Sequence, residues 1–565
     1  MIIEIDVNGR KIKARKGERI LDALKANGIR VPTLCNMDGF KPTGSCRICV
    51  VEVEGRPDLV PACSYPVEEW MVLYTHSPRV IQARRTILEL LLAEHPEGCL
   101  TCDRNRGCEL QELADELNIS CQNLSHVQVS KRIDNTSRAL IRDNAKCILC
   151  GRCIRICEEQ QAVAAIDFLH RGSRIEVGTV LDKGLSYSSC VNCGQCILVC
   201  PTGALKERNH MNDVVRSLHD PELLTIGLVD PAVMASAGEH FRSKGGKELR
   251  TSLFSALKRA GFNRVYENHW GLEKEATILT NKFLQQIDAN SQKPMFLSSC
   301  PSFVQYVIQS QSDLIPLLAP VKPARQLMPM LLRKQISAET GWPESRIVVV
   351  YLTACIAAKP EAHTSIGPGS DGYGPDHVLS IREMYRVIRL LGINIDKLGV
   401  EMLPDEFGGN ARSGYLPALS GGMTEAIIRI LQSDASETSL PGGRPARLRG
   451  TREIREFSVQ AKGRTFQMAS ISGLTNFKNW YQDVLDKNRH FDLIEVMACP
   501  GGCINGGGQP IAGPHTDIKS RAKMVFELDN LYSGISPSED LPLPPGLELP
   551  LQATLATFLP REIIK

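Results

Sequence analysis

The sequence predicts a multidomain protein that combines small α+β domains with a larger α/β domain. Two observations carry this prediction. All but one of the 20 cysteines fall into short spaced groups or directly follow apolar runs, which is typical of small metal-binding domains. From about residue 210 onward, short apolar runs alternate with helical patterns, which favours α/β layering. The 565 residues allow about three to four domains, and we place them at 1–78, 79–126, 127–209 and 210–565.

Composition excludes several classes of partner and indicates a compartment. The 66 Lys and Arg and 63 Asp and Glu residues leave a net charge of +3, too small to indicate binding to nucleic acid or to a membrane surface. No apolar run reaches the about 18 residues that predict a membrane span. Residues 1–11 alternate like a strand, unlike a signal or transit peptide. Cysteines in CxxC groups without an export signal indicate a reducing, anaerobic cytoplasm rather than disulfides.

The first predicted domain begins with a strand pair that turns at Asn8-Gly9, followed by a helix over 19–27 that Gly28 closes. Four cysteines then follow, with spacings of 11, 3 and 14 residues: Cys35, Cys46, Cys49 and Cys63. Four thiolates satisfy the two irons of a [2Fe-2S] cluster. Structural zinc is the alternative, but zinc sites prefer paired short spacings that this segment lacks.

The second predicted domain opens with a helix over 80–94 that ends before Pro96. Its buried stripe is expected to consist of Ile87, Leu88, Leu91 and Leu92. The residues that follow are His95, Cys99, Cys102 and Cys108. Three cysteines leave a [4Fe-4S] cluster one ligand short, so His95 is the candidate fourth ligand, although a histidine at a helix end is more often a cap or a surface residue. Cys121 lies outside every group, and we expect a buried, unreactive thiol there.

The third predicted domain carries the pattern CxxCxxCxxxC twice, at 147–157 and at 190–200. This repeat is the motif of two-cluster bacterial ferredoxins, in which the fourth cysteine of each run binds the other cluster. The first expected [4Fe-4S] ligand set is therefore Cys147, Cys150, Cys153 and Cys200. The second expected set is Cys157, Cys190, Cys193 and Cys196.

In residues 210–565, three strand-like runs lead into cysteines, at Cys300, Cys355 and Cys499. Ligands of open α/β sheets lie beyond the carboxyl ends of the strands, so we expect these thiols to face one crevice. A GxGxxG pattern at 367–372 neither directly follows a strand nor directly opens a helix, so it does not predict a nucleotide site. The proline-rich tail at 532–565 is expected to be an extended surface segment.

The run CysProGlyGlyCysIleAsnGlyGlyGlyGlnPro at 499–510 resembles the third active-site motif of iron-only ([FeFe]) hydrogenases, and the resemblance covers nearly the whole chain. It implies that a [4Fe-4S] cubane is held by Cys300, Cys355, Cys499 and Cys503. Cys503 would also bridge to a two-iron subsite with carbon monoxide, cyanide and a dithiolate amine, which completes the H-cluster. The residues expected to lie around this group are Met497, Asp230, Pro231 and Ala232. The glycines at 501–502 and 506–508 would let the backbone approach the cluster closely.

The same resemblance implies a β-grasp [2Fe-2S] ferredoxin-like domain, a helical His/Cys cluster domain with His95 as a ligand, a bacterial-type two-cluster ferredoxin domain and an α/β catalytic domain. The implied cofactors are one [2Fe-2S] cluster, three accessory [4Fe-4S] clusters and the H-cluster. The implied activity interconverts dihydrogen with protons and electrons. Ferredoxin or another redox partner would exchange the electrons, and maturation proteins would insert the H-cluster.

The first two active-site motifs depart from the family pattern. Ser299 precedes Cys300 where the family has a cysteine that carries protons, and a hydroxyl exchanges protons far less readily than a thiol. Ala358 replaces a lysine that contacts a cyanide, whereas Lys359 and Glu361 remain as candidate catalytic residues.

Further departures surround the expected pocket. Asp230 stands where the family has a small apolar residue, and Pro417 replaces an aromatic. The carboxylate relay of the family falls on Ile278 or Leu279. These changes concern the rate more than cluster binding, so we favour hydrogen turnover. Two alternatives stay open: a hydrogen-sensing or regulatory protein with slow turnover, and an electron-transfer protein that lacks the two-iron subsite.

Overall fold

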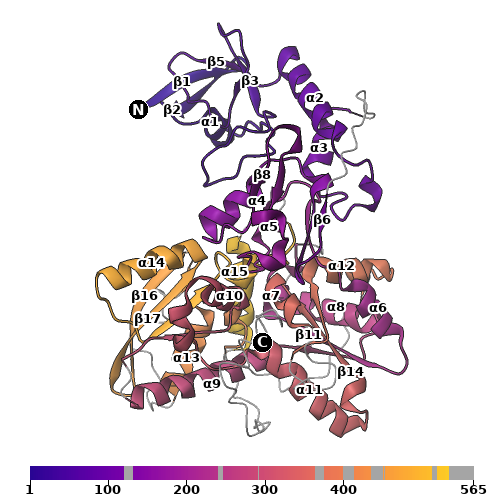
Figure 1. Cartoon of the computed structure of the whole chain (residues 1–565), viewed down its shortest axis with the longest axis vertical. Coiled ribbons are helices and arrows are strands. Elements are labelled where there is room, and N and C mark those ends of the chain that lie inside the picture. Colours follow the sequence, from indigo (N-terminus) through magenta and orange to yellow (C-terminus); the bar gives the residue numbers. More distant parts are fainter. Residues whose placement is uncertain are drawn as a thin grey trace.

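The computed structural model describes residues 1–119, 132–239, 246–289, 292–362, 374–398, 413–433, 449–450, 452–511 and 518–532. The described parts are arranged along the longest axis of the molecule, with the five-stranded N-terminal sheet at one end and two four-stranded sheets at the other (Figure 1). The cysteine-rich middle segment lies between them. Cys121, the glycine pattern at 367–372 and the tail from 533 onward fall outside the described residues.

The N-terminal sheet has the strand order β2-β1-β5-β3-β4. Its strands are β1 (Ile2–Val7), β2 (Arg10–Arg15), β3 (Val50–Val53), β4 (Val60–Pro61) and β5 (Val72–Tyr74). The predicted turn between β1 and β2 is confirmed, because Asn8 and Gly9 have the positive φ angles of 54° and 81° that a tight hairpin turn requires. Helix α1 (Ile20–Ala26) covers the sheet and ends before Gly28, whose φ of 72° also matches the prediction.

Helix α2 (Pro78–Ala93) leads into the 3-10 helix η1 (Cys99–Thr101) and helix α3 (Glu109–Glu116). Ser77 begins α2 as its cap, because the hydroxyl accepts the backbone N–H of Val80 at 3.3 Å. Leu88 is fully buried, and Ile87, Leu91 and Leu92 pack partly buried beside it. The predicted apolar stripe of this helix is therefore confirmed.

The middle segment combines a three-stranded sheet of order β10-β7-β6 with a separate hairpin. Its strands are β6 (Ile133–Asp134), β7 (Leu140–Asp143), β8 (Asp167–Leu169), β9 (Glu176–Gly178) and β10 (Leu205–Glu207). Its helical elements are η2 (Asn144–Lys146), α4 (Arg152–Arg155), the π-helical turn η3 (Ile156–Gln160), η4 (Gly172–Arg174), η5 (Val180–Asp182), η6 (Leu185–Tyr187) and α5 (Gln195–Val199). Gly151 and Gly194 precede α4 and α5 at equivalent places, and both have a φ of 72°, so the sequence repeat is also a structural repeat.

The C-terminal part contains two sheets. The first has the order β12-β11-β14-β15 and is entirely parallel; its strands are β11 (Leu224–Val229), β12 (Arg264–Glu267), β14 (Ile347–Thr353) and β15 (His377–Ser380). The second has the order β13-β18-β17-β16, with strands β13 (Met295–Phe296), β16 (Ile454–Ala461), β17 (Arg464–Ser472) and β18 (Leu493–Met497). Every residue of β11, β14, β15 and β18 is buried, as expected for strands covered on both faces.

Helices surround these two sheets (Figure 1). The helices before β14 are α6 (Met211–His219), α7 (Pro231–Ala237), α8 (Gly246–Arg259), α9 (His269–Asp288), α10 (Pro301–Ser310), η7 (Ser312–Leu317), α11 (Ala324–Thr340) and η8 (Glu344–Arg346). Those after it are η9 (Ile356–Glu361), α12 (Ile381–Leu390), η10 (Ile395–Lys397), η11 (Leu416–Ala418), α13 (Gly422–Ser433), α14 (Leu474–Asp486), η12 (Cys503–Asn505) and α15 (Ile518–Tyr532). Mixed α/β content is therefore confirmed.

Buried charged groups join the middle segment to the C-terminal part. Arg382 on α12 binds Glu207 of β10, with its Nε at 3.0 Å from one carboxylate oxygen and its Nη2 at 2.8 Å from the other. The same Nη2 donates to the carbonyl oxygen of Gly507 at 2.8 Å. The backbone N–H of His210 donates to Glu383 at 3.1 Å. These bonds fix the cysteine-rich segment against the loop of the third motif.

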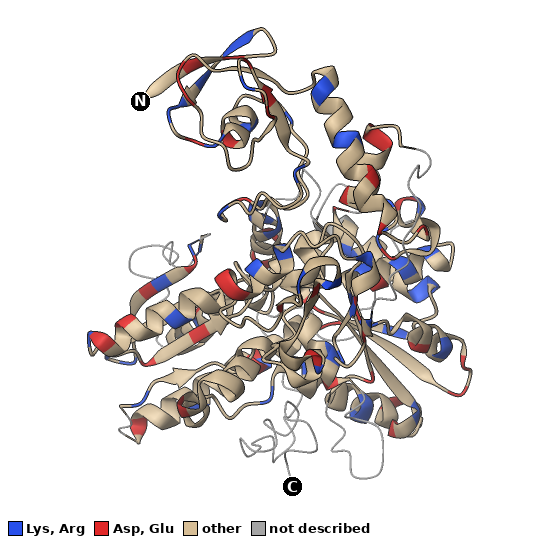
Figure 2. Cartoon of the chain, turned by 45° about the horizontal axis from the view of Figure 1, so that its top comes forward, with Lys and Arg blue, Asp and Glu red and all other residues tan. Residues whose placement is uncertain are grey.

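Charged residues of both signs are interspersed over the described elements (Figure 2), in agreement with the net charge of +3. Within the described residues, no helix is both long and apolar enough to cross a membrane.

Candidate active site and cluster-binding sites

Four thiols line one cavity of about 70 Å³, at the carboxyl ends of strands from both C-terminal sheets: Cys300, Cys355, Cys499 and Cys503. Cys300 follows β13 and directly precedes α10, and Cys355 follows β14 and directly precedes η9. Cys499 follows β18, and the N–H of Ala498 donates to the Cys300 sulfur at 3.5 Å. The structure thus brings the predicted ligands of the three motifs together at the edge where α/β sheets bind their ligands.

Burial favours the protonated form of three of the cavity thiols when no metal is bound: Cys355, Cys499 and Cys503. Burial raises the pKa of Cys355 to about 12, and it raises the pKa values of Cys499 and Cys503 well above the ordinary range. Within the described residues, no three His, Cys, Asp or Glu side chains are placed to hold one metal ion. A cubane binds each thiolate through a different iron, so its ligands need not converge on a single point.

The glycines of the third motif serve close backbone packing. Gly501 and Gly502 have φ angles of 78° and 104°, which favour glycine. A Cβ on Gly502 would lie 2.5 Å from the backbone N of Ser420, and one on Gly507 would lie 2.6 Å from the Cα of Gly194. The atoms that exclude a side chain are therefore protein backbone, and Gly507 lets the loop of the third motif pack against the second cysteine run.

Ser299 and Glu275 form a hydrogen-bonded pair on the cavity wall. The Ser299 hydroxyl donates to Glu275 Oε1 at 2.5 Å, and the N–H of Ala324 donates to Oε2 at 2.7 Å. Burial raises the pKa of Glu275, and the hydrogen bond from Ser299 offsets part of this increase. The carboxylate that contacts Ser299 is therefore Glu275, which lies about one turn before Ile278 and Leu279 on α9. Sequence analysis did not identify this residue.

Arg325 and Glu361 form a buried ion pair beside this wall. The Arg325 Nε and Nη2 donate to the two Glu361 oxygens at 2.8 and 2.9 Å, and Nη1 donates to the carbonyl oxygen of Ser299 at 2.6 Å. Arg325 lines the cavity, and nothing in the sequence pattern indicated it. The pair places one guanidinium cation next to the candidate cluster site.

Asp230 and Tyr351 form a second polar pair in the same cavity. The Tyr351 hydroxyl donates to Asp230 Oδ2, and the N–H of Ala232 donates to Oδ1 at 2.8 Å. Burial raises the pKa of Asp230, and the hydrogen bond from Tyr351 offsets part of this increase. Pro231 and Ala232 are buried in the first turn of α7.

Other expected site residues separate into two groups. Met497 and Pro417 line the cavity. The position of Lys359 does not fit the catalytic role expected for it. Its ammonium group is buried, donates to the carbonyl oxygen of Val378 at 2.9 Å and pairs with Glu383 at 2.8 Å. Local geometry explains this position, because η9 is a 3-10 helix whose Lys359 side chain points toward β15 and α12, whereas its Glu361 side chain binds Arg325.

The cysteines of the N-terminal part are gathered to different degrees. Electrostatic contacts join Cys35 with Cys46 and Cys63, and Cys49 with Cys63, so these four thiols form one buried group. His95 is buried after α2. Cys108 is buried and interacts electrostatically with Cys102. Cys99 is exposed at the start of η1.

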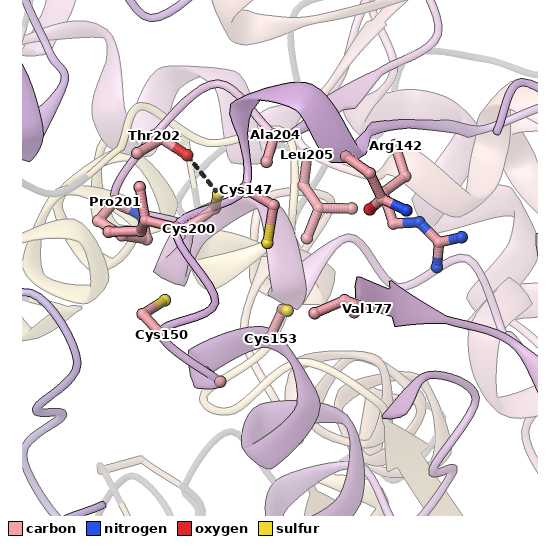
Figure 3. Close-up of a pocket in the computed structure, with 13 residues that line it drawn as sticks. Arg142, Cys147, Cys150, Cys153, Val177, Cys200, Pro201, Thr202, Ala204 and Leu205 are labelled. Atoms are coloured by element: carbon pink, nitrogen blue, oxygen red, sulfur yellow. Dashed lines mark hydrogen bonds between the residues drawn. The ribbon is translucent and has the colours of Figure 1, made fainter. Parts of the chain in front are cut away.

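The paired runs of the middle segment form two thiol groups. One cavity of about 20 Å³ is lined by Cys147, Cys150, Cys153 and Cys200. Figure 3 shows these sulfurs around the cavity, with Cys200 within 3.8 Å of the Thr202 hydroxyl. Electrostatic contacts join the second group, which consists of Cys157, Cys190, Cys193 and Cys196. Cys193 also lines the cavity of Cys300, Cys355, Cys499 and Cys503, so the second group lies directly beside the candidate active site.

Comparison with known proteins decides the family. Residues 224–507 match the model of the iron only hydrogenase large subunit, C-terminal domain. The NADP-reducing hydrogenase subunit HndD of Solidesulfovibrio fructosivorans is 31% identical over 542 residues, which cover 94% of this chain and 92% of that protein. The chain belongs to the iron-only hydrogenase family. Iron hydrogenase 1 of Clostridium pasteurianum, another member, is 29% identical over 536 residues, covering 94% of this chain and 93% of that protein.

Further matches describe the accessory parts of this family member. Residues 2–78 match a 2Fe-2S iron-sulfur cluster binding domain, and residues 146–204 match a 4Fe-4S dicluster domain. Residues 84–122 match the NADH-ubiquinone oxidoreductase-G iron-sulfur binding region. A solved variant of the [FeFe]-hydrogenase HydA1 of Chlamydomonas reinhardtii is 21% identical, covers 57% of this chain and 90% of its own, and has a TM-score of 0.48. The family and domain matches make the chain an [FeFe]-hydrogenase-like oxidoreductase with accessory iron-sulfur domains.

Proposed function

We propose that the chain interconverts dihydrogen with protons and electrons at the cavity of Cys300, Cys355, Cys499 and Cys503, and that its accessory clusters conduct the electrons. One observation carries this proposal: the four thiols share their cavity with Cys193 of the second ferredoxin-type group. An electron carrier bound there would lie next to the reaction site. Family membership supports the same function and does not favour sensing or electron transfer alone.

The donor set fits the H-cluster. Thiolates are the soft ligands that iron-sulfur clusters require, and four of them border one enclosed space. Cys503 would be the thiolate shared with the two-iron subsite. The H-cluster, when bound, supplies an open iron coordination site and stores electrons. Apolar side chains complete the lining and exclude water from the site: Leu272, Pro417, Ala418, Met423 and Met497.

Side chains of the protein itself would transfer the protons. Ser299 can accept a proton on its hydroxyl oxygen while its own proton passes to Glu275, which lies at 2.5 Å. Arg325 holds the Ser299 carbonyl, and Glu361 holds Arg325. We assign Glu275 as the proton-holding group of this pathway, and Arg325 and Glu361 as positioning residues.

The accessory ligands follow from the thiol groups. We propose a [2Fe-2S] cluster in a β-grasp domain at 1–78, bound by Cys35, Cys46, Cys49 and Cys63. We propose a [4Fe-4S] cluster at 79–126, bound by His95, Cys99, Cys102 and Cys108. The ferredoxin-type domain at 127–209 would hold two cross-ligated [4Fe-4S] clusters, the one nearer the catalytic domain at 210–565 bound by Cys157, Cys190, Cys193 and Cys196. Proximity of Cys193 to Cys300 supports this order.

The redox partner is either ferredoxin or a separate nicotinamide-oxidising subunit. Ferredoxin fits a chain of clusters in a reducing cytoplasm. A nicotinamide-linked subunit is favoured by the similarity to a NADP-reducing hydrogenase subunit and to an NADH-ubiquinone oxidoreductase-G region. In both versions the chain depends on maturation proteins to insert the two-iron subsite.

The purified and matured chain should evolve hydrogen with reduced ferredoxin as the electron donor. It should not do so with NADPH or NADH, because its sequence carries no nucleotide-binding motif at a strand-to-helix turn. Gas chromatography with each donor measures this. Reduced methyl viologen is the positive control for an intact active site. Activity with viologen alone would assign the electrons to a dedicated partner subunit, and activity with NADPH alone would contradict the assignment of nicotinamide chemistry to a partner.

A further inference from the structure

Arg104 is a buried cation between two groups of predicted cluster ligands. The His/Cys group consists of His95, Cys99, Cys102 and Cys108, and the first ferredoxin-type group consists of Cys147, Cys150, Cys153 and Cys200. Arg104 belongs to the segment of the first group, where it is only 7% exposed. Its Nη2 donates to the carbonyl oxygen of Cys200, which borders the cavity of the second (Figure 3). The guanidinium therefore reaches from one predicted cluster site to the next.

The two groups pack directly against each other at Arg104. A Cβ on Gly203 would lie 2.8 Å from the Cys102 sulfur and 3.6 Å from the Arg104 Cγ. The backbone N–H of Glu109 donates to the carbonyl oxygen of Pro201 at 3.0 Å. The loop that follows Cys200 thus contacts both Cys102 and Arg104, and no side chain separates the two groups at Gly203.

The described side chains compensate the charge of Arg104 only in part. Within the described residues, its Nε has no hydrogen-bond partner. The carboxylate that acts on it electrostatically is Glu109, and Arg152 already binds both oxygens of Glu109 at 2.7 and 2.9 Å. Arg382 adds a second cation nearby. Arginine stays charged in proteins, and a buried charge is costly unless it is paired, so this position favours an anion beside the guanidinium.

We propose that Arg104 is the shared counter-ion of the two iron-sulfur clusters on either side of it and raises the reduction potentials of both. A thiolate-bound cluster is an anion, and net charge and hydrogen bonding set its potential. Reduction adds a negative charge, so a nearby cation stabilises the reduced state more than the oxidised state. This inference rests on the accessory clusters of the proposed function.

The shared position of Arg104 matters for the electron step between the clusters. One electron leaves the cluster of the His/Cys group, which is oxidised, and enters the cluster of the first ferredoxin-type group, which is reduced. The guanidinium keeps its charge and its protons throughout. Because the same cation acts on both clusters, both potentials rise while the driving force between them changes little.

Two substitutions separate the charge of Arg104 from its hydrogen bond and its shape. Arg104→Gln removes the charge but keeps an N–H donor for the Cys200 carbonyl. Arg104→Lys keeps the charge but removes the guanidinium. Arg85→Met is the matched control, because half-buried Arg85 also donates to a backbone carbonyl, that of Leu117 at 2.6 Å. Arg85 lies on α2, about 12 Å of helix before its end at Ala93.

The test is a redox titration monitored by EPR, on the full chain with its iron-sulfur clusters and without the maturation proteins. His95→Ala and Cys147→Ala assign the signals, because each should alter one of the two clusters. Arg104→Gln should lower the equilibrium constant for reduction of each cluster about tenfold, the order expected for one unit charge at an effective dielectric constant of about 20. For one electron this is a shift of about 59 mV to more negative potential. Arg104→Lys and Arg85→Met should titrate like wild type.

Each outcome decides the inference. Wild-type potentials in Arg104→Gln, with both clusters present, would overturn it. Equal shifts in Arg104→Gln and Arg104→Lys would also overturn it, because they would assign the effect to the shape of the guanidinium. Loss of either cluster from Arg104→Gln alone would support the counter-ion, whereas loss from both variants would contradict it. Absence of both [4Fe-4S] signals from wild type would contradict the proposed accessory clusters, and with them the inference.

Discussion

Replacing Glu275 with glutamine is expected to lower hydrogen turnover by about 10²–10⁴-fold, the usual contribution of a general acid–base group. Glu275 accepts the Ser299 hydroxyl at 2.5 Å and the Ala324 N–H at 2.7 Å. Glutamine can satisfy both neighbours, by donating to Ser299 and accepting from Ala324, but it cannot carry a proton. Rates of hydrogen evolution and uptake at equal cluster content measure the effect.

Glu273→Gln is the matched control, because residues two apart on a helix do not share a face; it should keep wild-type turnover. Equal turnover in Glu275→Gln and wild type would show that protons leave by another route.

The pH dependence of protein stability gives an independent test of the raised pKa of Glu275. Because the pKa of Glu275 is raised by burial, the folded state binds this proton more tightly than the unfolded state. Relative to Glu275→Gln, the wild type should therefore lose stability as pH rises through that pKa.

Arg325→Met is expected to destabilise the catalytic part by about 3–5 kcal/mol, because it leaves a buried carboxylate without its partner. Arg325 and Glu361 are only 8% and 1% exposed and share two hydrogen bonds. Anaerobic calorimetry measures the change as a lower unfolding temperature of the catalytic part.

The double variant Arg325→Met with Glu361→Met should recover most of that loss, because it removes both buried charges together. Arg264→Met is the control: its pair with Glu339 at 2.6 Å is partly exposed, and the expected cost is about 0–1 kcal/mol. A double variant no more stable than Arg325→Met would show that the guanidinium contributes mainly through its bond to the Ser299 carbonyl.

Local chemistry made much of the fold predictable. The turn at Asn8-Gly9 and the helix closed by Gly28 follow from residues that adopt a positive φ. The runs ending at Cys355 and Cys499 are buried strands, as their continuous apolar sequence indicated. The run before Cys300 forms only the short strand β13, Met295–Phe296, because pairing with β18 is limited to these two residues.

The polar wall of the cavity was not predictable in the same way. Glu275, Arg325 and Tyr351 come from α9, α11 and β14, and their convergence depends on how those elements pack. No sequence spacing links them to the cysteine motifs. Lys359 shows the opposite failure: its place beside the second motif indicated catalysis, but the short helix η9 directs it toward Glu383.

Infrared spectroscopy of the anaerobically matured chain tests the central claim most directly. If Cys503 bridges the cubane to a two-iron subsite in the cavity, bands of iron-bound carbon monoxide and cyanide should appear where proteins are transparent. These bands should shift under hydrogen gas, and Cys503→Ala should lose them while the accessory clusters stay filled. Absence of the bands from wild type, with a fully occupied cubane at Cys300, Cys355, Cys499 and Cys503, would contradict the account.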